Sequence, residues 1–132
     1  MKIESKKGLI NRPAKDVFDY LSDMNNFKNL LPEDKISNWK SDVNQCSFKI
    51  QGATTISFVI ESKEEPNLIR MISGDQSPFN FNLDVHLIEE DGKTTGYQVF
   101  EADINMFMKM MVEKPLQNLF DFIVDRLVVV LN

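Results

Sequence analysis

The sequence predicts an α+β fold, in which helices cover one face of a curved antiparallel sheet of about seven strands. Three observations support this prediction. Apolar and polar residues alternate between residues 35 and 104, as they do in strands with one buried face. After residue 105 apolar residues recur at helical spacing, and residues 13–31 carry two shorter helical patterns. We therefore expect a strand, two short helices, six strands and a long C-terminal helix packed across the concave face of the sheet.

Length and composition restrict the classes of protein. A chain of 132 residues is long enough to bury a core, and we expect residues 1–132 to form a single domain. A net charge of −5 argues against nucleic acid and anionic membranes, which both require a basic face. The first ten residues, "MKIESKKGLI", contain no apolar signal-peptide core, and no apolar run is long enough for an integral membrane segment. We therefore expect a cytoplasmic protein.

The N-terminal elements follow from local signals. Residues 2–10 have mixed alternation and predict an edge strand that ends at "NRP". Pro13 suits the first position of a helix, because the N–H that it lacks would have no partner there. After the pair Asn25 and Asn26, which can cap a helix, the phrase "NNFKNLLP" predicts a second short helix that stops at Pro32.

The central part of the chain predicts a meander of six strands, separated by the turn signals "DVNQ", "QGAT", "EEPN", "GDQSP" and "EDGKTTG". Its clearest strand is "FNFNLDVHLI", residues 79–88, in which five apolar residues alternate with Asn, Asp and His. The same alternation assigns to buried faces Cys46, Phe48, Ile50, Ile56, Phe58, Ile60, Ile69, Met71, Phe100, Ala102 and Ile104.

The C-terminal helix begins with an unusual segment, "NMFMKMMVEKPLQN", residues 105–118. Its Met, Phe and Val side chains extend almost all round a helix, so they must be enclosed on several sides or face a partner. Methionine fills irregular gaps in cores and also lines adaptable binding surfaces, so both interpretations remain open. Pro115 removes one helical hydrogen bond, and we expect the helix to kink or restart there. The following stripe contains Leu116, Leu119, Phe120, Ile123, Leu127, Val130 and Leu131.

The order of these elements resembles the helix-grip superfamily of START-related, polyketide-cyclase-like and birch-pollen-allergen-like proteins, also called SRPBCC. The segments that carry the resemblance are "NRPAKDVFDYLSDMNNFKNLLP" and "KPLQNLFDFIVDRL", and "NNFKNLLP" also resembles the coenzyme-Q-binding branch. The resemblance covers the whole chain. It implies a helix-grip fold with a cavity between the sheet and the long helix, which members use for lipids, sterols, hormones, quinones or polyketide intermediates. Most members bind and a minority catalyse, so the site residues must decide.

No residue pattern predicts catalysis. By alternation His86 lies on the polar face of its strand, outside the predicted cavity, whereas Cys46 lies among apolar neighbours that should raise the pKa of its thiol. Glu101 and Asp103 fall on the face opposite Phe100, so they form no acid–base pair inside the cavity. With one cysteine and one histidine there is no Cys/His metal site, and we expect no metal and no cofactor.

We therefore predict a protein that binds a hydrophobic or amphipathic small molecule, such as a lipid, quinone or polyketide, without chemistry of its own. A cyclase- or hydratase-like enzyme is the first alternative, and it would need Tyr20, Tyr97, Arg70 or Glu101 in the cavity. The second is an interaction or chaperone-like module that forms a homodimer through the C-terminal helix, using Phe122, Val128 and Val129. The residues predicted to line the cavity are Phe27, Leu31, Trp39, Phe48, Phe58, Phe79, Phe81, Phe100, Met108 and Met111.

Overall fold

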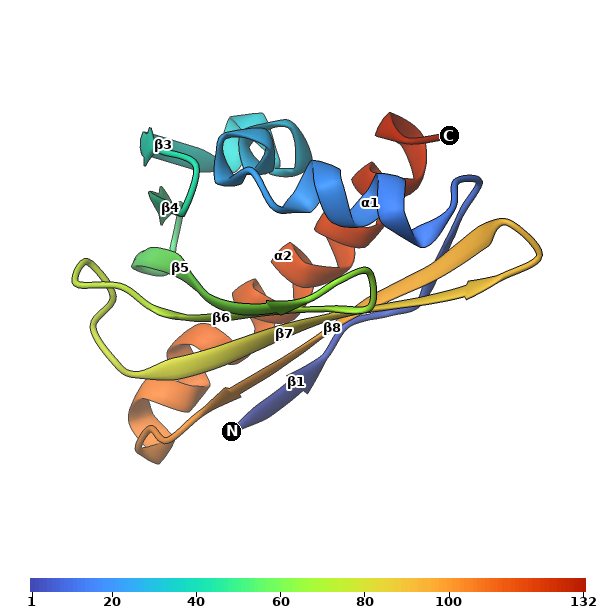
Figure 1. Ribbon diagram of the computed structural model, residues 1–132. Coiled ribbons are helices and arrows are strands. Elements are labelled where there is room, and N and C mark those ends of the chain that lie inside the picture. Colours follow the sequence, from blue (N-terminus) through green and yellow to red (C-terminus); the bar gives the residue numbers. More distant parts are fainter.

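The computed structural model describes residues 1–132 and confirms the α+β prediction. Helices pack on one side of an antiparallel sheet (Figure 1). The helices are α1 (Ala14–Leu21), α2 (Met106–Val130) and two 3₁₀ helices, η1 (Met24–Leu30) and η2 (Glu33–Lys35). The strands are β1 (Lys2–Glu4), β2 (Gly8–Ile10), β3 (Ile36–Ser41), β4 (Gln45–Ile50), β5 (Thr55–Glu64), β6 (Leu68–Ser73), β7 (Phe81–Glu90) and β8 (Lys93–Ala102).

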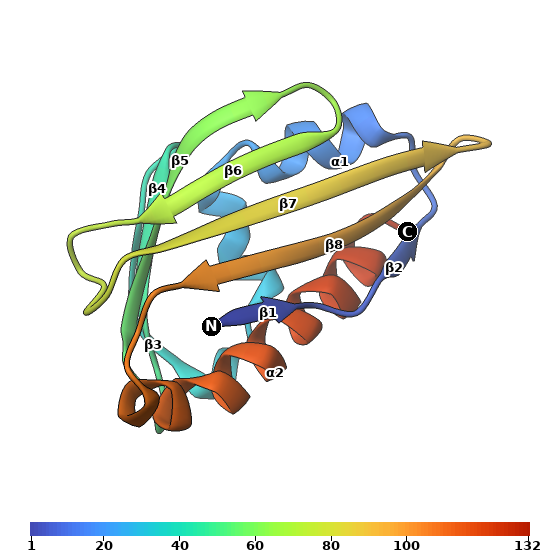
Figure 2. The same cartoon turned by 90° about the horizontal axis from the view of Figure 1, so that it is seen from below.

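The sheet has the strand order β1-β8-β7-β6-β5-β4-β3, and β2 also pairs with β8. It is strongly curved, so that β3 and β4 stand at a steep angle to β7 and β8 (Figure 2). The β7–β8 hairpin turns at Asp91 and Gly92, whose φ angles of 55° and 75° suit a two-residue Asp-Gly turn. The curvature brings β3 and β4 against η1 at one end of the sheet, while β1, β2 and β8 at the other end contact α2.

The first predicted strand is divided into two parts. β1 pairs with residues 99–101 of β8, and β2 pairs with residues 94–96. Between them Ser5 leaves the regular ladder: its N–H donates to the Gln98 carbonyl, and its Oγ accepts from the Gln98 N–H, both at 2.9 Å. The eight strands therefore correspond to the expected seven, with the first one interrupted.

Both expected short helices are present, but their caps differ from the prediction. Helix α1 begins at Ala14, one residue after Pro13, and its cap comes from a distant segment: Glu89 accepts the Ala14 N–H at 2.7 Å. A carboxylate at this end also interacts favourably with the helix dipole. Helix η1 is capped by Asp23, which accepts from the Asn25 N–H at 3.0 Å, and the Asn pair lies inside the helix.

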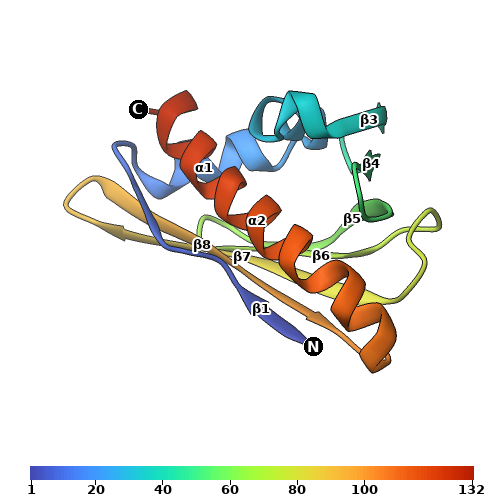
Figure 3. The same ribbon diagram turned by 180° about the vertical axis from the view of Figure 1, so that it is seen from behind.

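Helix α2 is one continuous helix of 25 residues, so the restart considered at Pro115 does not occur. Asn105 caps it by accepting the Met108 N–H at 2.8 Å. The carbonyl that Pro115 leaves unpaired belongs to Met111, which is 48% exposed, so water can satisfy it. Helix α2 contacts η1, β1, β2 and β8 (Figure 3). None of the helices combines the length and the hydropathy needed to cross a membrane.

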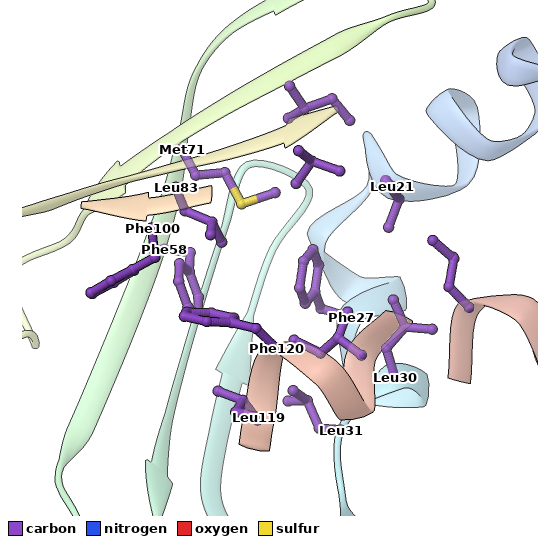
Figure 4. Close-up of a cluster of buried hydrophobic side chains, with 14 of the residues drawn as sticks. Leu21, Phe27, Leu30, Leu31, Phe58, Met71, Leu83, Phe100, Leu119 and Phe120 are labelled. Atoms are coloured by element: carbon purple, nitrogen blue, oxygen red, sulfur yellow. The ribbon is translucent and has the colours of Figure 1, made fainter. Parts of the chain in front are cut away.

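A run of phenylalanine rings connects the helical layer with the sheet. Phe27 of η1 contacts Phe58 of β5 at a ring distance of 6.2 Å, and Phe58 contacts Phe81 of β7 at 5.4 Å. Phe81 meets Phe100 of β8 at 4.9 Å, and Phe100 meets Phe120 of α2 at 5.2 Å. All five rings belong to a cluster of 30 buried residues, and Figure 4 labels Phe27, Phe58, Phe100 and Phe120 within it. We call these five rings the phenylalanine chain.

Truncating the middle of the phenylalanine chain should destabilise the fold strongly. Phe58 is fully buried, so we expect Phe58→Ala to lower the free energy of unfolding by about 3–5 kcal/mol. Urea unfolding followed by circular dichroism measures this. The control is Val43→Ala, because Val43 is 54% exposed and its truncation should change the free energy by at most about 0.5 kcal/mol. Similar losses for both variants would contradict this account of the core.

Candidate ligand-binding site

The residues predicted to line a cavity occupy three kinds of position. The fully buried ones pack together between the sheet, η1 and α2 (Figure 4). Trp39, Phe79 and Met108 are partly buried and pack against the margin of this cluster, whereas Met111 is largely outside it. The structure therefore brings most of the predicted set together as packed side chains. The buried members are Phe27, Leu31, Phe48, Phe58, Phe81 and Phe100.

A hollow of about 970 Å³ adjoins this cluster, between η1, η2, β3 and the C-terminal half of α2. We call it the η1–α2 hollow. Its polar lining residues are Lys28, Asn29, Glu33, Ser37, Asn38 and Arg126. Its apolar lining residues are Leu31, Ile36, Trp39, Phe122 and Val130. Leu31 belongs both to the hollow and to the buried core, so this wall separates the hollow from the phenylalanine chain.

A β-bulge in β3 positions Trp39 at the hollow. The pairing with β4 shifts between Ser37 and Lys40, and Asn38 has a φ of 57°. Asparagine tolerates this left-handed conformation better than most residues, and the extra residue turns Trp39 to the same side as Ile36. The Trp39 ring stacks on Phe48 at 5.8 Å, and its Nε1–H donates to Ser41 Oγ at 3.2 Å.

The side chains of α2 that reach the hollow are spaced by one helical turn. Phe122, Arg126 and Val130 stand at i, i+4 and i+8, so they share one face of the helix. Arg126 bridges to η1, because its Nε–H donates to the Asn29 carbonyl at 3.4 Å. Leu31 and Trp39 were predicted from the sequence as cavity residues, whereas Ile36, Arg126 and Val130 were not. One signal was available in the sequence: Phe122 lies outside the main apolar stripe, and Arg126 and Val130 follow it at intervals of four residues on the same helix face.

The cyclase- or hydratase-like alternative requires an ionisable side chain in the cavity, but all four candidates for this role lie outside the buried core. Arg70 forms a two-point ion pair with Asp84, with N–O distances of 2.8 and 3.0 Å, and both residues are solvent-accessible. Tyr97 stacks on His86 at 4.9 Å, on the outer side of the sheet where alternation places His86. Glu101 is exposed. The Tyr20 hydroxyl accepts a surface hydrogen bond from Asn29 Nδ2 at 3.3 Å.

Cys46 is 2% exposed, and its burial raises the pKa of the thiol to about 12. The thiolate, which is the reactive form, is therefore strongly disfavoured at neutral pH. Cys46 and His86 also lie on different strands and opposite faces, so they form no nucleophile–base pair. The structure contains no group of three or more His, Cys, Asp or Glu side chains arranged to hold a metal ion.

Two further hollows lie elsewhere on the sheet. One, of about 710 Å³, lies over the ends of β1, β8, β7 and β6 and includes Lys2, Asn82 and Glu101. The other, of about 590 Å³, lies beside β3, β4 and β5, and only Trp39 and Cys46 among its lining residues are apolar. All three hollows have mixed linings, and what distinguishes the η1–α2 hollow is its contact with the buried core through Leu31.

The first two turns of α2 carry an exposed apolar face. Met106, Phe107, Met110 and Met111 are 67%, 73%, 77% and 48% exposed, and we call these four residues the Met face. Of the two alternatives that the sequence left open, enclosure by the chain itself does not hold for these four side chains. Only Met108 and Val112 of this segment turn toward the core, because one curved sheet covers one side of a helix.

The fold is that of a START-like helix-grip protein. Residues 8–132 match the CoxG family, which is described as a subunit of carbon monoxide dehydrogenase, and the chain belongs to this family. The predicted resemblance to the SRPBCC superfamily is thereby confirmed. No curated protein matches the sequence.

Solved structures with the same fold share little sequence with this chain. XoxI from Bacillus cereus superposes with a TM-score of 0.74 at 12% identity, covering 98% of this chain and 94% of that one. A START superfamily protein from Mycobacterium smegmatis has a TM-score of 0.69 at 9% identity, with 98% and 96% covered. CalU16 from Micromonospora echinospora has a TM-score of 0.60 at 18% identity, with 94% and 70% covered. At these identities the likeness concerns the fold alone.

The burial of Cys46 gives a direct chemical test of the structure around β4. We expect the folded protein to resist iodoacetamide at neutral pH and to react fully in urea, because folding excludes the reagent and keeps the thiol protonated. Intact-mass spectrometry counts the added groups. Ser62→Cys provides the control, since residue 62 is exposed and a thiol there should react in the folded state. Rapid alkylation of the folded wild type would refute the placement of Cys46.

Proposed function

We propose that the protein is a non-catalytic, cytoplasmic binding protein for a hydrophobic or amphipathic small molecule of lipid-, quinone- or polyketide-like character. The observation that carries this proposal is the η1–α2 hollow, whose apolar wall adjoins the packed phenylalanine chain. Its volume of about 970 Å³ lies at the upper end of the range typical of ligand pockets, roughly 300–1,000 Å³.

We further propose that the hollow is the entrance to the space between the sheet and α2. Leu31 directly follows η1, a 3₁₀ helix with weaker hydrogen-bond geometry than an α-helix, and Phe27 of η1 lies behind it. A small movement of η1 would expose Phe27 and Phe58 to a ligand chain. The same aromatic side chains would then exchange contacts with each other for contacts with the ligand. This route would engage the residues predicted to line the cavity.

Two observations support binding without catalysis. Tyr20, Tyr97, Arg70 and Glu101, the donors that an enzyme would use, have their polar groups at the surface. The description of the family names a subunit of carbon monoxide dehydrogenase, which fits an accessory role beside an enzyme better than an independent reaction. A carrier or holder of an apolar molecule is such a role.

Ligand binding can be tested with an uncharged apolar dye, Nile red, added to protein freed of bound lipid. We expect saturable binding, and we expect Trp39→Ala to weaken it roughly tenfold, because a large apolar wall is lost. The control is Ile88→Ala, which removes an apolar side chain that is 54% exposed and lies outside the hollow. Equal affinities of the two variants, or no saturable binding by the wild type, would contradict the proposal.

The Met face favours a second candidate function, self-association through α2. A solvent-exposed cluster of three methionines and one phenylalanine is costly in water and is typical of interaction surfaces. The three residues first considered for a dimer interface point in different directions: Phe122 lines the hollow, Val128 lies against Gly8, and Val129 is 64% exposed. We therefore propose that a homodimer, if formed, uses the Met face.

Light scattering over a range of protein concentrations tests this second candidate. We expect a dimer that dissociates when Phe107→Glu and Met110→Glu are combined, because two charges from each protomer would be buried at the interface. Val129→Glu introduces a charge at the exposed far end of the same helix and should leave the mass unchanged. A wild-type protein that stays monomeric at high concentration would exclude this candidate.

A further inference from the structure

The η1–α2 hollow contains two cationic side chains without a counter-ion. Neither Lys28 nor Arg126 has a carboxylate within 4.0 Å. The other two arginines behave differently, since Arg12 lies 3.8 Å from Asp16 and Arg70 lies 2.8 Å from Asp84. The chain has a net charge of −5, so carboxylates are abundant elsewhere. Unpaired lysines such as the exposed Lys28 are common in this chain, whereas Arg126 is its one arginine without an ion pair, and it lies at the hollow.

The guanidinium of Arg126 makes one long hydrogen bond and retains free donors. It is partly buried, and Phe122 and Val130 flank it one turn away on each side. Its Nε–H donates to the Asn29 carbonyl at 3.4 Å, while Nη1 and Nη2 have no acceptor in the protein. A charged group beside apolar walls is stabilised when it is both paired and hydrogen-bonded. The planar guanidinium can bind both oxygens of a carboxylate at once.

The rest of the polar lining does not cancel this charge. Glu33 of η2 is the only acidic residue of the hollow, and it forms no ion pair. The other polar residues, Asn29, Ser37 and Asn38, are neutral. Two cations against one anion leave a formal charge of +1 next to the apolar wall made by Leu31, Trp39 and Phe122.

We propose that the hollow selects an amphiphile with a single anionic head group, specifically a free long-chain carboxylic acid. This inference rests on the proposed binding function and specifies its ligand class. The carboxylate is bound by the Nη groups of Arg126 and by Lys28, and the chain lies against Trp39 and Phe122 with its end toward Leu31. The head group thus meets the unpaired cations while the tail covers the apolar wall.

Three amphiphiles of equal chain length separate head-group recognition from apolar binding: hexadecanoate, hexadecanol and hexadecyltrimethylammonium. Each is titrated below its aggregation limit into protein freed of bound lipid, with displacement of Nile red as the readout. We expect hexadecanoate to bind at least about tenfold more tightly than hexadecanol, and the cation to bind most weakly.

Substitutions of the charged residues that line the hollow test the assignment of the head-group site. Arg126→Gln should weaken hexadecanoate binding roughly tenfold and leave hexadecanol binding unchanged. Lys28→Gln should act in the same direction with a smaller effect, and Glu33→Gln should tighten the binding of hexadecanoate. Lys63→Gln is the control, because Lys63 is an exposed lysine of β5 outside the hollow. The hexadecanol affinity also shows whether each variant keeps an intact hollow.

The outcomes distinguish this inference from the proposed function. If hexadecanol binds as tightly as hexadecanoate, or if Arg126→Gln and Lys28→Gln both leave the hexadecanoate affinity unchanged, the anionic head group is refuted while apolar binding stands. If Nile red binds but none of the three amphiphiles displaces it, the carboxylic acid is likewise excluded as the ligand class. If neither Nile red nor any amphiphile binds, the proposed function fails together with this inference.

Discussion

The contact between Phe27, Phe58, Phe81, Phe100 and Phe120 is the constraint on which the rest of the structure depends. These rings come from η1, three strands and α2, and each lies within 6.2 Å of the next. The curvature of the sheet turns the inner faces of β5 and β8 toward the helical layer in which this contact forms. The contact also connects η1 with α2 by way of the sheet, and it therefore fixes where the hollow beside them lies.

The buried core and the proposed ligand site have residues in common. In the structure Leu31 belongs to both the buried cluster and the wall of the hollow, and Trp39 stacks on a buried ring while facing outward. Packing stabilises the protein without ligand, and each ligand contact in the interior must replace a contact between side chains. Binding strength is thus limited by the cost of opening the core. Selectivity between ligands is better provided by the polar lining of the hollow, where Arg126 has unused hydrogen-bond donors.

The sequence predicted those parts of the structure that follow from local periodicity. Alternation identified both faces of β7 and the buried end of β8 at Phe100 and Ala102, and the stripe after Leu116 identified the buried face of α2. It did not predict the bulge at Asn38, the continuity of α2 through Pro115 or the exposure of Met110, because these depend on neighbours distant in sequence. In the hollow, Leu31 and Trp39 were identified as large apolar residues, whereas Arg126 was missed because its partner lies on η1.

The cap that Glu89 supplies to Ala14 has a consequence for the order in which the protein folds during synthesis. Helix α1 has eight residues, too few to persist in water alone, and it packs on β7 and β8. β1 and β2 likewise pair only with β8. The segment from β1 to α1 therefore has no stable partner until the β7–β8 hairpin has left the ribosome. It stays unfolded and accessible to chaperones while the 81 residues from Ser22 to Ala102 are synthesised.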